Sequence, residues 1–324
     1  MKRLIVFTRS SSDMRQDFKT EELKAELERS LGFTLRSLVR LDGASALNFK
    51  AVRESDGLVF AVKCSPKLRQ VMFDHLVRHL EETKGTKAVS RLFADDCPPT
   101  FRGYNVICLS WCAGERRFPD QLSRLELEAF LLEYLSFSAA MQKATLIAPA
   151  DPIERWRARA LEACRGVLGR PLRNLIEREL PADEVRYRPE RLGVIHGDFH
   201  HGNFLFVSGR LNGVFDLEEF CRGYPADDIV RYFVCAAEHL RWYEQGRKRK
   251  LLQRFAEAVG FLAYPTEDWL TAIDGLLVRK IFSKTTCRCP GIGQVLNLLF
   301  RARFYLALKR IARQRRRQTS NSLA

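Results

Sequence analysis

The chain has 324 residues, of which 46% are hydrophobic and 29% charged, so it has the composition of a globular protein longer than one typical domain. No apolar run approaches the eighteen residues of a membrane span, and the run at residues 4–7 is too short for a signal peptide. Nine cysteines without a repeated framework are typical of free thiols, so we expect a cytoplasmic protein. The net charge of +15 points to anionic partners.

The first part of the chain is predicted to form strands. Four short runs rich in β-forming residues are separated by loops and turns, at residues 37–41, 47–53, 58–63 and 106–109. A helix is predicted between the last two runs, with Ser65 as its N-cap, Pro66 as its first residue and Gly85 past its end. Apolar residues recur at every fourth position of this segment, at Leu68, Met72, Leu76 and Leu80.

Beyond residues 110–114 the pattern becomes mainly helical. Helical spacing is found at residues 122–141, 152–168, 172–180, 229–245, 248–259, 267–282 and from 294 into a basic terminal run. A mostly β part followed by a mostly α part predicts an α+β, two-lobed architecture. We therefore predict an N-terminal β-rich lobe at 1–109, a hinge at 110–114 and a C-terminal helical lobe at 115–324.

The most informative segment is the run His-Gly-Asp-Phe-His-His-Gly-Asn at residues 196–203, followed by Asp216. Short apolar runs flank it, and a turn with a returning strand precedes Asp216, at residues 192–195, 203–207, 208–210 and 214–215. Asp198 and Asn203 are therefore expected on a loop between strands, with Asp216 brought close by a hairpin.

These three side chains fit the needs of phosphoryl transfer. The reaction depends on positioning and on neutralising charge more than on covalent help from the protein. Asp198 would accept the proton of an attacking hydroxyl. Because magnesium prefers oxygen ligands, Asp216 would supply a carboxylate and Asn203 a neutral carbonyl oxygen.

The pattern His-Gly-Asp-x-His-x-x-Asn followed by Asp-x-Glu resembles the aminoglycoside phosphotransferase and choline kinase family, which shares the protein-kinase-like fold. Residues 223–225 and Asp228 also match that family's Gly-x-Pro-x-x-Asp, whereas His201 stands where proline is frequent. The resemblance implies a small-molecule kinase that transfers the γ-phosphate of ATP or GTP to a hydroxyl, with Asp198 catalytic and Mg2+ held by Asn203 and Asp216.

The resemblance also implies supporting roles around the motif. His196 and Asp228 would brace the loop, and His200 would either support it or lie near the phosphates. Glu218 would contact a second metal or cap the next segment.

Nucleotide contacts are implied for the N-terminal lobe. Lys63 matches the strand lysine that meets the phosphates, although a lysine ending a strand is by itself more often a snorkelling surface group. Small residues of the loop at 42–46, Ser45 among them, would let backbone amides approach the phosphates. Ser110 and Cys112 lie in the hinge, whose backbone would meet the base. The acidic partner of Lys63 stays open among Asp74, Glu81 and Glu82.

Other functions fit the same residues less well. Metal-dependent phosphoesterases also open with Gly-Asp-x-His, but their further Gly-Asp-x-x-Asp and Gly-Asn-His-Asp segments are missing. A protein kinase would carry a longer activation segment after Asp216. In this chain residues 223–228 follow Asp216 too closely for such a segment. A non-catalytic kinase-like binding protein that uses its basic tail stays as an alternative.

Basic residues concentrate at residues 247–250 and 309–317. A solvated helix face is the plain explanation, and a peripheral contact of the tail with an anionic membrane or an acidic ligand is the functional one. We do not expect nucleic acid as a partner. Since an enzyme for polycationic aminoglycosides would be expected to carry an acidic pocket, a cell-envelope sugar is at least as plausible an acceptor as an aminoglycoside-like compound.

Overall fold

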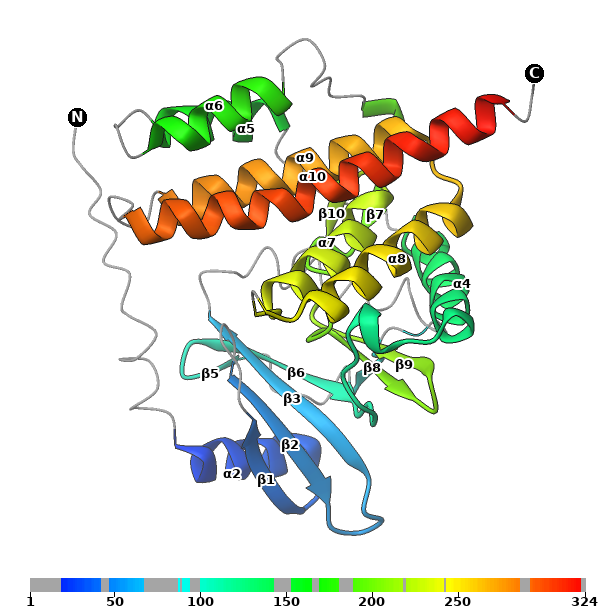
Figure 1. The fold of residues 1–324 in the computed structure, drawn as a ribbon. Coiled ribbons are helices and arrows are strands. Elements are labelled where there is room, and N and C mark those ends of the chain that lie inside the picture. The colour runs from blue at the N-terminus through cyan, green and yellow to red at the C-terminus, as the bar shows by residue number, and fades with distance from the viewer. Residues whose placement is uncertain are drawn as a thin grey trace, which may run out of the picture. The chain divides into compact units, whose positions relative to one another are not determined.

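The computed structural model describes residues 19–41, 47–66, 87, 89–93, 100–142, 153–164, 169–180, 189–217, 220–241, 243–285 and 292–321. It divides into two compact units, the first formed by Met1–Lys84 and Val89–Cys112, the second by Gly85–Ala88 and Ala113–Ala324. The first unit is built on a sheet and the second is mainly helical (Figure 1). This arrangement confirms the predicted α+β class.

The first unit carries an antiparallel sheet with the strand order β1-β2-β3-β6-β4, and β5 also pairs with β6. The strands are β1 (Leu35–Leu41), β2 (Leu47–Arg53), β3 (Val59–Pro66), β4 (Arg91–Leu92), β5 (Thr100–Phe101) and β6 (Tyr104–Ser110). The four predicted strands correspond to β1, β2, β3 and β6.

Helix α2 (Thr20–Leu31) covers one face of this sheet (Figure 1). Its buried side chains are spaced four residues apart, at Leu23, Leu27 and Leu31. They pack with Phe60 and Val62 of β3, both fully buried. Because side chains alternate along a strand, Lys63 lies on the opposite face of the sheet, where it is only 7% exposed.

The predicted start of the helix after β3 is wrong. Ser65 and Pro66 continue the strand, paired with Asn105 and Tyr104 of β6, and Ser65 is buried. The long β6 supplies a pairing partner that outweighs the local capping signal. Proline is tolerated because β2 pairs with β3 only as far as Cys64, so Pro66 has a neighbouring strand on one side only. The rest of that helix lies outside the described residues, as do Asp74, Glu81, Glu82 and Gly85.

The second unit contains seven α-helices within the described ranges. They are α4 (Arg124–Met141), α5 (Ile153–Ala163), α6 (Arg170–Glu179), α7 (Ala226–Glu238), α8 (Gln245–Leu262), α9 (Thr266–Thr285) and α10 (Ile292–Asn321). Helix α4 begins at a capping box in which Ser123 and Glu126 bond each other's backbone amides. No helix in the described part of the chain combines the length and apolar content that crossing a membrane requires.

Two small antiparallel sheets lie within the second unit. Strand β7 (Gly193–Ile195) pairs with β10 (Cys221–Gly223), and β8 (Phe204–Val207) forms a hairpin with β9 (Arg210–Val214). The hairpin turn uses Ser208 and Gly209, both at positive φ. The loop between β7 and β8 therefore carries the motif at residues 196–203, as the sequence predicts.

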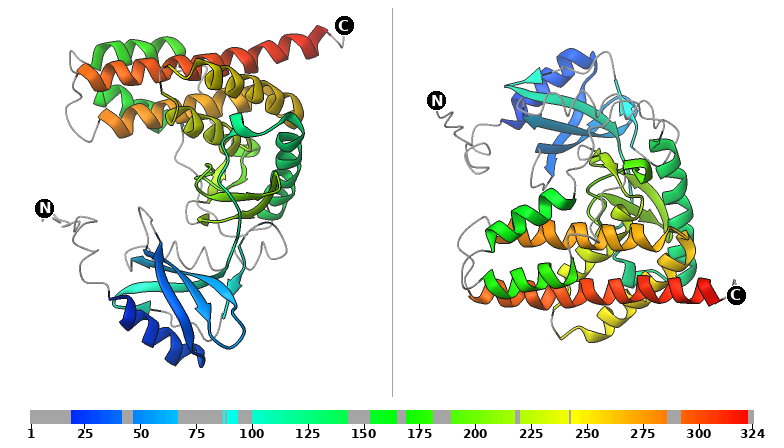
Figure 2. Two further views of the ribbon diagram at one scale, coloured as in Figure 1. Left: turned by 60° about the horizontal axis from the view of Figure 1, so that its bottom comes forward. Right: turned by 90° about the horizontal axis from the view of Figure 1, so that it is seen from above.

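Helices α9 and α10 pack side by side, with α5 and α6 against them (Figure 2). Lys309 of α10 is 2% exposed and forms an ion pair with Asp274 of α9, at 2.8 Å. Its ammonium also donates to the carbonyl of Glu179 at the end of α6. The beginning of the basic terminal run is thus built into the helical core.

Candidate active site

Asp228 fixes the entry to the loop between β7 and β8. Its carboxylate accepts the backbone N–H of His196 at 2.8 Å and of Gly197 at 3.0 Å, and the hydroxyl of Tyr134 donates to it at 3.3 Å. The carboxyl group is buried, with 1% of the residue exposed, and its pKa is raised by burial against the opposing effect of His196 and the two amides. The predicted buttressing role of Asp228 is confirmed by these contacts.

His196 ties the loop to the β8–β9 hairpin. The residue is fully buried, its Nδ1 accepts the N–H of Asp198, and its Nε2 lies 2.9 Å from the carbonyl oxygen of Phe215. Because Nδ1 is an acceptor, Nε2 carries the proton and donates it to that carbonyl. The ring therefore joins the loop to the hairpin, in agreement with the predicted bracing role.

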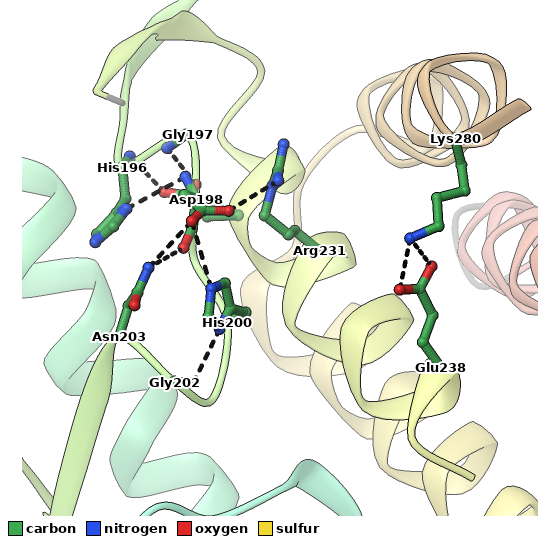
Figure 3. Close-up of polar contacts among 10 residues, drawn as sticks. His196, Gly197, Asp198, His200, Gly202, Asn203, Arg231, Glu238 and Lys280 are labelled. Atoms are coloured by element: carbon green, nitrogen blue, oxygen red, sulfur yellow. Dashed lines mark hydrogen bonds and ion pairs between the residues drawn. The ribbon is translucent and has the colours of Figure 1, made fainter. Parts of the chain in front are cut away.

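The carboxylate of Asp198 is held by three side chains (Figure 3). Arg231 of α7 donates to Oδ1 at 3.1 Å, Asn203 donates to Oδ2 at 3.2 Å, and Nε2 of His200 lies 3.4 Å from Oδ2. Nδ1 of His200 accepts the N–H of Gly202, so the ring presents its protonated Nε2 to Asp198. Between the two roles left open for His200, the structure shows support of the loop.

Asp198 is ionised in this setting. Burial favours its neutral form, but the hydrogen bond from His200 and the charge of Arg231 outweigh burial and lower the pKa to about 2. The side chain keeps 32% of its surface exposed, so another molecule can reach the carboxylate.

Asn203 and Asp216 are brought together by the hairpin. The N–H of Phe215 donates to the carbonyl of Asn203 at 2.9 Å, and Phe204 pairs with Val214 on the adjacent strand. The side-chain amide of Asn203 turns its nitrogen to Asp198, and its oxygen faces away (Figure 3). Asp216 follows Phe215 with φ of 64°, a left-handed conformation that is uncommon outside glycine and that aspartate and asparagine adopt more readily than other residues.

Aromatic packing makes a rigid floor under the loop. Phe199, between Asp198 and His200, is fully buried and packs against rings of α4, β8 and α7, at Phe130, Tyr134, Phe204 and Tyr232. Such a floor restricts the movement of the two neighbouring polar side chains.

The segment after Cys112 is pinned to the same hairpin. Glu115 and Phe206 exchange two backbone hydrogen bonds of 2.9 Å each, and Asn212 donates to the carbonyl of Ala113. Gly114 has φ of 141°, and a Cβ there would lie 2.5 Å from the carbonyl oxygen of Phe206. Only glycine fits this close approach.

The predicted residues fall in two groups. Asp198 and Asn203 lie in direct contact in the second unit, with Asp216 beside them on the hairpin. Lys63, Ser110 and Cys112 belong to the first unit. Ser110 is the last residue of β6, where its hydroxyl accepts the N–H of Ser90. Two further predicted residues, Ser45 and Glu218, lie outside the described residues.

The sequence reasoning missed Arg231. Its position in the sequence is the one feature that could have indicated its role. Arg231 follows Asp228 by three residues and therefore lies on the same side of α7, one helical turn further along.

Comparison with known proteins identifies relatives of the whole fold. The model of the phosphotransferase enzyme family matches residues 21–270. No curated protein sequence matches the chain. Solved structures similar to it include the amicoumacin kinase hAmiN in complex with AMP-PNP, Ca2+ and Ami, with a TM-score of 0.62 and 12% identity over 92% of this chain and 96% of that one.

Two further structures show the same likeness. Spectinomycin phosphotransferase APH(9)-Ia, in complex with ADP and spectinomycin, has a TM-score of 0.60 and 12% identity over 92% of this chain and 98% of that one. An aminoglycoside phosphotransferase from Alicyclobacillus acidocaldarius has a TM-score of 0.56 and 15% identity over 87% and 92% of the two chains. At these identities the structures show a shared kinase-like fold.

Proposed function

The chain belongs to the phosphotransferase enzyme family, and on this basis we propose that it is a small-molecule kinase that transfers the γ-phosphate of ATP or GTP to a hydroxyl group. The observation that carries the proposal is the loop at residues 196–203. It presents an ionised, partly exposed carboxylate, Asp198, in contact with the side-chain amide of Asn203, and the hairpin returns the chain to this loop at Phe215, next to Asp216.

In the proposed reaction the hydroxyl oxygen of the acceptor attacks the γ-phosphorus, and the bond from that phosphorus to the bridging oxygen of the leaving diphosphate breaks. The proton of the hydroxyl passes to Asp198, and the products are a phosphate monoester and ADP or GDP. A carboxylate with a pKa of about 2 is a weak base. That suffices when the transition state is loose, because the hydroxyl becomes acidic only as its bond to phosphorus forms.

His200 and Arg231 are positioning residues in this scheme. Each holds one carboxylate oxygen of Asp198, which fixes the direction from which the acceptor hydroxyl must approach. The hydrogen bond from His200 and the charge of Arg231 also keep the carboxylate ionised before the substrate arrives.

The donor set fits magnesium. Asn203 offers a neutral oxygen that faces away from Asp198 (Figure 3). Asp216 follows Phe215, whose N–H is bonded to the carbonyl of Asn203, so its carboxylate is the proposed second ligand. These two residues would hold the ion, which when bound would neutralise charge on the nucleotide phosphates.

Lys63 is the proposed partner of the nucleotide phosphates. It is nearly buried in mid-sheet, where a lysine has no structural reason to lie unless its ammonium serves a ligand or an internal partner. Residues 110–112 are proposed to meet the base through their backbone, since the hydroxyl of Ser110 is engaged with Ser90. The solved complexes of relatives with AMP-PNP and ADP support a nucleotide as the phosphate donor.

A nucleotide-consumption screen against sugars, amino alcohols and aminoglycosides tests the proposal. Asp198→Ala should abolish acceptor-dependent consumption while binding of a fluorescent ATP analogue survives. Glu190→Gln, an exposed acid of the same unit, is the matched control and should keep wild-type turnover. If Asp198→Ala kept full turnover, Asp198 would not be the base. If no acceptor stimulated nucleotide consumption by the wild-type chain, the kinase-like binding protein would be favoured instead.

A further inference from the structure

Positive charge is concentrated at the end of the chain. Residues 275–324 contain twelve lysines and arginines and no aspartate or glutamate, whereas basic and acidic residues are nearly balanced in the part before them. This segment therefore carries most of the net charge of +15. Charge gathered in this way attracts an anionic partner more strongly than an evenly spread excess of the same size.

Helix α10 presents part of this charge on one side. Figure 1 shows the helix at the surface of the second unit, in front of α9. The inward side of α10 carries its buried residues, which are Leu298, Ala302, Phe304, Tyr305, Leu308, Lys309 and Ala312. Arg303, Arg310 and Arg313 are exposed. With 3.6 residues per turn, the three arginines fall within about 80° of one another on the opposite side of the helix.

The charge on this side is not neutralised by the helix itself. The sequence of α10 includes no acidic residue, so its arginines cannot pair with a carboxylate three or four positions away. Among the described residues, Arg303 and Arg310 form no ion pair. Exposed arginines elsewhere in the second unit differ in this respect, because Arg124 and Arg173 each pair with a glutamate one turn along their helix at 2.9 Å.

Partly exposed leucines lie among these arginines. Leu299 and Leu306 are seven positions apart, and both fall within about 60° of Arg303 and Arg310 around the helix axis. A helix side that mixes basic and apolar residues is typical of contact with a membrane surface. There the apolar groups enter the boundary of the acyl chains and the basic groups stay at the level of the lipid phosphates.

From the charge and the packing we infer that this side of α10, here called the arginine face, docks the protein on an anionic lipid surface. The arginine face consists of Arg303, Arg310 and Arg313 with Leu299 and Leu306. A planar lipid surface needs only one exposed side of a helix. A nucleic-acid groove admits a helix that protrudes from its protein, whereas α10 is flanked by α6, α8 and α9. Guanidinium groups suit lipid phosphates, whose oxygens they bind in a bidentate fork.

Co-sedimentation of the full-length protein with vesicles tests the inference. Vesicles of phosphatidylcholine alone are compared with vesicles that contain equal amounts of phosphatidylcholine and phosphatidylglycerol. Binding to the mixed vesicles should be at least tenfold tighter, and it should be lost at high salt because ions screen the attraction. Equal binding to the two kinds of vesicle would overturn the inference.

Two double variants locate the effect on the helix. Arg303→Gln combined with Arg310→Gln should weaken binding to the mixed vesicles at least tenfold, since each basic residue near such a surface contributes about fivefold. Arg249→Gln combined with Lys250→Gln is the matched control, because it removes the same charge from exposed positions of α8. Equal weakening by the two double variants would assign the binding to net charge and overturn the role of the arginine face.

A fluorescent oligonucleotide separates a lipid partner from nucleic acid. Leu306→Ala should weaken binding to the mixed vesicles at least twofold and leave any binding of the oligonucleotide unchanged, because only a lipid surface receives the leucine. Suppose instead that the oligonucleotide binds, that the Arg303 and Arg310 double variant abolishes this binding, and that the mixed vesicles are not bound. That result would overturn the inference in favour of nucleic acid.

Discussion

Replacing Asp228 by alanine should destabilise the second unit more than any other single change near the loop. The carboxylate accepts the amides of His196 and Gly197, and the substitution leaves both buried N–H groups without an acceptor. Each such loss costs about 1–3 kcal/mol. Removing a buried carboxylate offsets part of this cost, since burial already raises its pKa. We expect a net loss of about 2–4 kcal/mol, a large share of a typical domain's stability.

Tyr134→Phe provides the matched control. It removes the third donor to Asp228 but leaves both amide bonds intact, and the tyrosine hydroxyl has a second acceptor in the carbonyl of Pro225. The expected cost is about 0.5–1.5 kcal/mol, the usual net value of one hydrogen bond.

Urea denaturation followed by circular dichroism would measure both variants, with the midpoint compared at equal slope. The chain has two units, so a denaturation curve does not report on the loop alone. Hydrogen exchange at the amides of His196 and Gly197 should therefore be measured as well. These amides should lose protection in Asp228→Ala and keep it in Tyr134→Phe. If Asp228→Ala were no less stable than the control, or if its two amides stayed protected, the carboxylate would not be what holds the loop.

Three further outcomes are expected. Arg231 helps to lower the pKa of Asp198, and the charged carboxylate is the active form. Arg231→Gln should therefore move the acid limb of the profile of kcat/KM against pH to higher pH by about one unit. An unchanged profile would contradict the positioning role of Arg231. Burial, with His239 and other nearby positive groups, lowers the pKa of His201 to about 4. Between pH 4 and the ordinary pKa of histidine, His201 binds a proton in the unfolded chain but not in the folded chain. The free energy of unfolding should therefore fall by about 1–3 kcal/mol as the pH drops through that window. His201→Phe should flatten this loss in denaturation measured at several pH values. Finally, Asn203→Ala or Asp216→Asn should raise the Mg2+ concentration needed for half-maximal nucleotide consumption at least tenfold, and an unchanged titration would remove both residues from the metal site.

Much of the fold could be predicted because local patterns and tertiary packing agree there. The run at 47–53 forms a strand with the predicted bounds, and Asp198 and Asn203 occupy the predicted loop between strands. Helix α2 was missed, although Leu23, Leu27 and Leu31 have helical spacing and Gly32 ends the helix in a left-handed conformation. The helical spacing of these leucines could be recognised in the sequence. The strands that bury them come later in the chain.

Long-range pairing explains the remaining differences. Ser65 and Pro66 carry the signature of a helix start, and only the partner strand β6, about forty residues later, makes them a strand end. Arg231 is a charged helix residue like many others until the folded chain brings it to Asp198 from 33 positions away. The pairing of β3 leaves no local pattern. The position of Arg231 three residues after Asp228 places it on the same side of α7, but does not identify Asp198 as its partner.

The burial of Lys309 bears on how the terminal basic run should be dissected experimentally. Because its ammonium is bonded to Asp274 and to the end of α6, a truncation upstream of this residue would leave an uncompensated carboxylate in the helical core. Loss of activity after such a deletion would report misfolding and would say nothing of a role for the tail. Substituting the exposed Arg310, which lies one position beyond the anchor, removes charge without touching it. A reporter fused after residue 321 would likewise leave the anchor in place.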